Sequence, residues 1–145
     1  MALDNHLVVA VSANFGDLAG GIEVIDLESR RSLGLYVSEA DLGGDITAVV
    51  MVDQRVGYAV VTDENFANMV RRFDLTNGQV SPPLGNLSGG YVATLAVDGQ
   101  RLVVGDRGSF SDPGAAGLKF FDAATGAFIE GPVDTGLPPY SIAVV

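Results

Sequence analysis

Short apolar runs rich in valine, isoleucine and leucine recur along the whole chain, and glycine, aspartate, asparagine or proline residues separate them. Runs of this length and composition are typical of β-strands. The best candidate for a helix is the segment 18–33, but its adjacent glycines and the alternation of Ile22 and Val24 favour a strand there. The pattern therefore predicts an all-β protein with no helix.

Three landmarks repeat along the chain in the same order. An aspartate closes an apolar run at a spacing of 48 residues, at Asp26, Asp74 and Asp122. An earlier run of each repeat ends in a phenylalanine, over 7–15, 58–66 and 102–110. A further apolar segment recurs at 46–53, 92–99 and 141–145. Because these registers agree, we expect three copies of one four-stranded antiparallel unit in a single repeat domain, residues 1–145.

Three segments carry a family resemblance: LKFFDAATGAFIEGPVDTGLPPYSIAVV at 118–145, YAVVTDEN at 58–65 and AVDGQRLVVG at 96–105. They resemble the bacterial YVTN family of β-propeller repeats, which implies that each unit is a propeller blade. The first repeat departs from the pattern, with ESR at 28–30 where the others have TNG and ATG. The family's strand order implies that the chain starts on the second strand of a blade and ends on an innermost strand, twelve strands in all.

Three blades are too few for a closed ring, since propellers have about four to eight. Joined end to end, the terminal sequences SIAVV and MALDNHLVV reproduce the internal junction ITAVVMVDQRVGY almost position for position. We therefore expect a homodimer, a six-bladed ring with strand exchange at the termini, in which each chain is a half-propeller. Two alternatives stay open: a nine-bladed ring of three chains, and a longer propeller that supplies the missing half.

The charge of the chain limits its partners. Eighteen acidic and eight basic side chains give a net charge of −10 and a pI near 4.2, which disfavours nucleic acid and anionic membranes. Without cysteine there are no disulfides or thiolate metal sites. No apolar run reaches the roughly 18 residues that span a bilayer, and residues 1–6 lack the features of a signal peptide. We expect a soluble protein; the compartment stays open, because members of the family are often exported.

The family's strand order places two sets of loops on one face, which would carry half of the acidic residues. These are Asp17, Glu39, Asp41, Asp45, Asp63, Glu64, Asp106, Asp112 and Asp134, opposed only by Arg107. Such a face would suit a cationic ligand, a hard metal ion such as Ca²⁺, or a basic protein surface. The predicted ligand-binding residues are Asp17, Asp63, Glu64, Asp106 and Arg107. The simpler interpretation is that these acids only keep the protein soluble, and no cofactor is assigned.

Enzyme activity is the alternative to a binding scaffold. Related propellers include lactonases, so carboxylates at the channel mouth could form the metal site of a hydrolase. The single histidine, His6, falls on the opposite rim, where we expect a surface residue, and Ser12, Ser109 and Ser111 have no histidine partner on their own rim. No catalytic residue is assigned. The repeated aspartates are expected to staple turns, and the repeated phenylalanines to pack between blades rather than stack on a ligand.

Overall fold

The structure is a computed structural model that describes residues 4–145. It contains three small antiparallel sheets, which confirms the all-β prediction. The first sheet comprises β1 (His6–Val11), β2 (Gly21–Asp26) and β3 (Arg31–Ser38). The second comprises β4 (Asp45–Met51), β5 (Val56–Thr62) and β6 (Asn68–Asp74). The third comprises β7 (Val92–Asp98), β8 (Arg101–Asp106), β9 (Gly117–Asp122) and β10 (Phe128–Val133).

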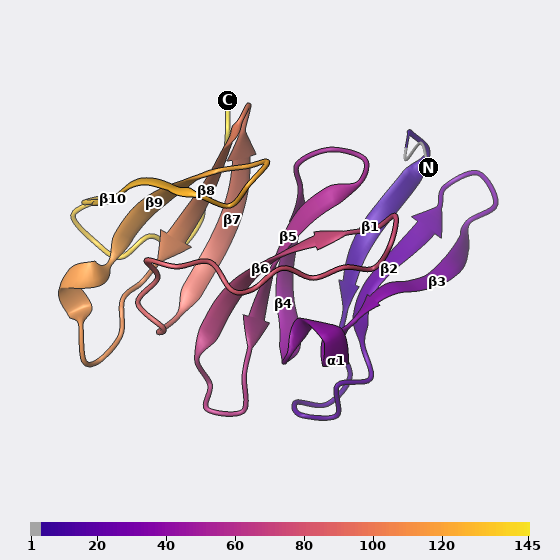
Figure 1. Cartoon of the computed structure of the whole chain (residues 1–145), viewed down its shortest axis with the longest axis horizontal. Helices are drawn as coiled ribbons and strands as arrows, with labels where there is room; N and C mark the ends of the chain where they lie inside the picture. The colour runs from indigo at the N-terminus through magenta and orange to yellow at the C-terminus, as the bar shows by residue number, and fades with distance from the viewer. Residues whose placement is uncertain (1–3) are drawn as a thin grey trace.

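The sheets follow one another across the molecule in chain order, with the second sheet between the other two (Figure 1). In each sheet the first long loop joins two neighbouring strands: β1 to β2, β5 to β6, and β8 to β9. These loops lie along the same lower edge in Figure 1. We call this edge the loop face and define it by residues 12–20, 63–67 and 107–116.

Strand pairing shows that the three sheets are built on one plan. His6 pairs with Asp26, Val56 with Asp74, and Arg101 with Asp122. The repeated aspartates therefore occupy equivalent positions, but His6 corresponds to Val56 and not to Gly57, as alignment on the final phenylalanines would suggest. The reason is one additional residue between Val56 and Phe66 in the second unit.

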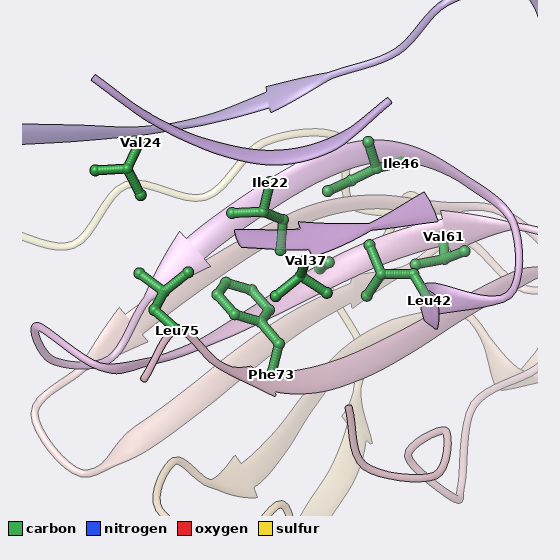
Figure 2. Close-up of a cluster of buried hydrophobic side chains, with 9 residues drawn as sticks. Ile22, Val24, Val37, Leu42, Ile46, Val61, Phe73 and Leu75 are labelled. Carbon is green, nitrogen blue, oxygen red and sulfur yellow. The ribbon is translucent and has the colours of Figure 1, made fainter. Parts of the chain in front are cut away.

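Two hydrophobic clusters hold the sheets together face to face. Figure 2 shows the first cluster, in which Ile22 and Val37 of the first sheet meet Phe73 of the second. The second cluster joins Tyr58 and Val60 to side chains of the third sheet. Burying each such side chain contributes about 1.5–3 kcal/mol. The middle sheet is thus covered on both faces, while each outer sheet has one face covered.

The second unit lacks a full fourth strand. Only a single bridge, Phe73 to Val80, marks its place. The segment 80–84 still runs along β6, since Ser81 N–H donates to the Arg72 carbonyl and Leu84 N–H to the Val70 carbonyl. Pro82 and Pro83 have no N–H with which to continue a ladder. Residues 134–145 also contain no strand, so ten of the twelve expected strands are present.

The prediction that the chain contains no helix was wrong at one loop. A short helix, α1 (Glu39–Leu42), follows β3; the Ser38 side chain caps its start, and Gly43 ends it in the left-handed conformation at φ 83. Serine before the helix and glycine after it are the usual signals of helix ends. The other helical element is the 3₁₀ turn η1 (Pro113–Ala115). Within the described part of the chain, neither is long and apolar enough to cross a membrane.

Candidate ligand-binding loop face

Buried acids reduce the predicted charge of the loop face. Glu39 is fully buried and accepts hydrogen bonds from the backbone N–H groups of Gly20 at 2.8 Å and Ile46 at 3.0 Å. Asp45 is also buried, and both of its carboxylate oxygens accept from Gly16 N–H at 3.0 Å. These two acids join the loop 12–20 to the start of β4, so their role in the fold is structural.

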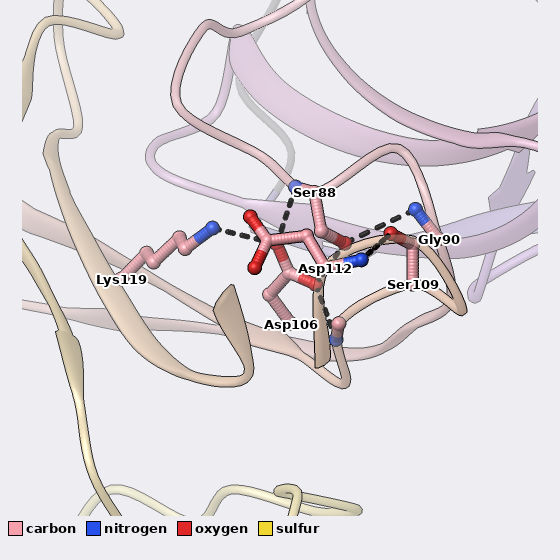
Figure 3. A network of polar contacts seen from close by, with 7 residues as sticks. Ser88, Gly90, Asp106, Ser109, Asp112 and Lys119 are labelled. Carbon is pink, nitrogen blue, oxygen red and sulfur yellow. Dashed lines mark hydrogen bonds and ion pairs between the residues drawn. The ribbon is translucent and has the colours of Figure 1, made fainter. Parts of the chain in front are cut away.

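Asp106, one of the predicted binding residues, is held in a network of buried polar contacts (Figure 3). Its carboxylate is fully buried and accepts from Lys119 Nζ at 2.8 Å, Ser88 Oγ at 2.6 Å and Gly108 N–H at 2.9 Å. Burial alone would raise the pKa of Asp106, but the hydrogen bonds from Lys119 and Ser88 outweigh this effect and the pKa lies below its usual value. The carboxylate faces the protein interior and holds the surrounding loops together.

Lys119 was not identified from the sequence, although a signal was present. It is the only lysine in the chain and lies inside the apolar segment LKFF. A lysine in a buried strand is rare unless a carboxylate pairs with it. The position of Asp106 at the end of the neighbouring strand β8 supplies that partner.

The other predicted acids lie near the protein surface. Asp63 is half-buried, and its Oδ1 accepts from the N–H groups of Asn65 and Ala67, both at 2.9 Å. Glu64 beside it is exposed. These two acids line a cavity of about 370 Å³ together with Asp45 and Phe15, which we call the acidic cavity. Asp17 is exposed on the neighbouring loop, where Asn14 donates to its carboxylate at 3.0 Å, and it does not line this cavity.

The prediction that the repeated phenylalanines pack between neighbouring units holds for Phe15 and Phe66, which contact each other, but not for Phe110. Phe66 is 73% exposed, and Phe110 is fully exposed at the tip of its loop. Phe15 and Phe66 stack on each other across neighbouring loops, with ring centroids 4.9 Å apart. Phe66 also has φ 61, an uncommon conformation for a bulky residue. The aromatic rings therefore belong to the loop face rather than to the core.

A larger cavity of about 850 Å³ lies on the other side of Phe66, between the loops of the second and third sheets. Its aromatic lining comes from Phe66, Tyr91 and Phe110, and Arg107 is its one charged lining residue. Gly90 and Gly108 also line it, and a Cβ at Gly90 would lie 2.0 Å from the Gly108 carbonyl oxygen, so glycine lets the two loops approach closely here. We call this cavity the aromatic groove. The Arg107 guanidinium at its edge lies 5.4 Å from the ring centroid of Tyr140.

The repeated aspartates staple turns as predicted. Asp26 accepts from Glu28 N–H at 3.0 Å, Asp74 from Thr76 N–H at 2.8 Å, and Asp122 from Thr125 N–H at 2.8 Å. Arg55 also donates to Asp74 at 2.6 Å and is the main reason that the pKa of Asp74 falls to about 2. These aspartates lie beside the β-turns and not on the loop face.

His6 is half-buried at the start of β1, away from the loop face. It lines a cavity of about 540 Å³ between β1 and β4, with Leu7, Val8 and residues 49–54. Its Nδ1 is buried and has no hydrogen-bond partner in the structure. An unsatisfied polar atom therefore lies in the residue at the edge of this mostly apolar cavity.

Comparison with protein-family models gives no match, and none of the curated proteins compared with the chain matches it either. Across residues 4–145, no group of three or more histidine, aspartate or glutamate side chains is arranged to hold a metal ion. The YVTN resemblance, the candidate Ca²⁺ and the metal-dependent hydrolase stay predictions.

Proposed function

We propose that this chain is a self-associating β-propeller scaffold, and that the assembled ring presents its loop face to a ligand. The observation that supports this proposal is an unfilled strand position. In the second sheet β5 lies between β4 and β6, and in the third sheet β8 lies between β7 and β9. The equivalent strand of the first sheet, β1, pairs with β2 alone within the described residues. Its inner edge is open, and an open edge can accept another strand.

The segment 141–145 has the sequence expected of the missing strand. Residues 48–50 of β4 read AVV and pair with residues 60, 59 and 58 of β5. Residues 143–145 also read AVV. By the equivalence of β5 and β1, these residues would pair with Ala10, Val9 and Val8 of a second copy, in that order. The same register applies to residues 94–96 of β7 and their partners in β8.

The position of the C-terminal segment agrees with this role. Pro139 is buried against Gly105 of β8, on the face of the third sheet that points away from the second sheet. Val144 and Val145 beyond it are 50% and more than 100% exposed. Leu7 beside the open edge of β1 is also 50% exposed. Pairing of the two segments would remove these apolar side chains from water and cover the cavity beside His6.

Exchange of this segment between two copies gives six sheets, which lies within the range of closed propellers. A two-fold axis relates the copies, so that each chain donates one segment and accepts one. The outer faces of the first and third sheets would then lie against each other across the ring, with the C-terminal segment between them. Both exposed segments and both open faces are accounted for by the same contact.

The mass in solution tests the proposal. Light scattering during size-exclusion chromatography should give twice the mass of the 15.0 kDa chain. Val144→Asp should shift the protein to the mass of one chain, because pairing would bury the new charge. The matched control is Gln100→Glu, which adds the same charge in the exposed turn between β7 and β8 and should leave the mass unchanged. A natural-sequence protein that stays folded at the mass of one chain would exclude the ring.

A further inference from the structure

The two cavities of the loop face adjoin each other. Asn65 lines both, and the stacked rings of Phe15 and Phe66 separate them, with Phe15 on the acidic cavity and Phe66 on the aromatic groove. We call these two neighbouring cavities together the depression. Its two parts differ sharply in chemistry.

One end of the depression is negative. Asp45 and Asp63 line the acidic cavity, but Asp45 accepts from Gly16 N–H of the first loop and Asp63 from Asn65 N–H of its own loop. Glu64 is exposed and makes no hydrogen bond or ion pair in the described part of the chain, so its charge is available to a ligand. No basic side chain lines this cavity. A basic group would therefore be favoured here, beside the face of an aromatic ring.

The other end carries the opposite charge. Arg107 is the only charged residue that lines the aromatic groove, and the exposed rings of Phe66, Tyr91 and Phe110 line the same groove. A guanidinium at the edge of an apolar groove binds a carboxylate with high directional preference. Exposed aromatic side chains beside lining glycines suit apolar side chains and extended backbone.

We propose that this depression binds an extended peptide with a basic residue, then apolar residues, then a free carboxyl terminus. The basic side chain enters the acidic cavity near Glu64, the apolar residues lie over Phe66 and Phe110, and the terminal carboxylate meets Arg107. An anion alone would be repelled by the net charge of −10, and a cation alone would leave the aromatic groove empty. The site lies within one chain, so it does not depend on ring closure.

Fluorescence anisotropy with labelled peptides tests this site. In one-letter code the probes are the peptides GGRAFL, GGRAAFL and GGRAAAFL, each with a free carboxyl end. The number of alanines varies the distance between the arginine and the apolar Phe-Leu end. Each has two matched controls, one with glutamine in place of arginine and one with a C-terminal amide. The best free-acid probe should bind about tenfold more tightly than either of its controls, as expected for the loss of one charge-assisted contact.

Three variants assign the contacts. Glu64→Gln should abolish the preference for arginine over glutamine, and Arg107→Gln the preference for the free acid over the amide. Phe66→Asn removes the ring but suits the left-handed backbone, and it should weaken every probe by about tenfold or more. Glu130→Gln, an exposed change on β10, is the control and should alter none of these values.

Two results would overturn the proposal: no probe binds the natural sequence more tightly than its controls, or the variants weaken acid, amide, arginine and glutamine peptides to the same extent. The mass of each sample is measured in parallel by light scattering. Peptide binding by a protein with the mass of one chain would refute the ring and keep the peptide site. A dimer that shows no preference among the peptides would keep the ring and refute the peptide site.

Discussion

The first and second sheets share one pairing plan but differ in their surroundings. Every residue from Val56 to Val61 of β5 is buried, because β5 has neighbours at both edges and packed sheets on both faces. No residue of β1 is fully buried, although its sequence LVVAV is as apolar. Burial of a strand is therefore decided by what lies beside it and not by its own composition. The apolar sequence of β1 fits an environment like that of β5, which another strand would provide.

The largest expected effect on stability distinguishes the second sheet, which is enclosed, from the first sheet, whose strand β1 has an open edge. Phe73→Ala should lower the free energy of unfolding by about 3–5 kcal/mol, because the ring is fully buried between the first and second sheets. Leu7→Ala on the half-exposed strand β1 should cost less than about 1 kcal/mol in the monomeric chain. Urea unfolding at a protein concentration where light scattering shows single chains measures both. Equal losses would mean that β1 is already enclosed.

The third sheet allows the same comparison for charges. Lys119→Met should cost about 3–5 kcal/mol, because it leaves the Asp106 carboxylate buried without its cation. Arg101→Met removes the ion pair with Asp98 at the surface and should cost at most about 1 kcal/mol. The double variant Asp106→Asn with Lys119→Met should recover part of the first loss. Urea unfolding near neutral pH measures the stability of each variant. Similar losses of stability for the two single variants would contradict the assigned burial.

A smaller effect concerns pH and the turn after β6. The pKa of Asp74 falls from 3.8 to about 2 in the folded protein, mainly through the hydrogen bond from Arg55. The folded state then binds fewer protons than the unfolded state, so the stability from this group is present above about pH 4 and is lost as the pH falls toward 2. Urea unfolding between these values should show a shallower decline for Asp74→Asn than for the natural sequence. Glu130→Gln removes an exposed carboxylate and should leave the slope as it is.

Local chemistry explains which features the sequence could predict. The strands follow from short β-branched runs, and the staples follow from an aspartate placed before each turn, as at Asp26 and Asp122. Helix α1 could also have been predicted, since Ser38 and Gly43 are ordinary cap residues. Glu39, Asp41 and Asp45 were instead predicted to lie in a loop.

The predicted site depended on distant contacts that the sequence pattern does not contain. Asp106 and Asp63 look alike in sequence, each at or just after the end of an apolar strand, yet one faces Lys119 in the interior and the other borders an open cavity. Phe110 repeats the position of Phe15 but has no ring to stack on. Spacing identified equivalent residues, whereas tertiary packing decided which of them reach a ligand.

The two prolines after β6 bear on aggregation. Ser81 and Leu84 direct their N–H groups inward to β6, and residues 82 and 83 lie between them. Both are proline and have no N–H, so the outer border of the middle sheet lacks a continuous row of amide donors here. Fibril growth, which requires a continuous row of such donors, has no template there. We therefore expect this border to resist aggregation by strand addition, even at concentrations that favour association elsewhere on the molecule.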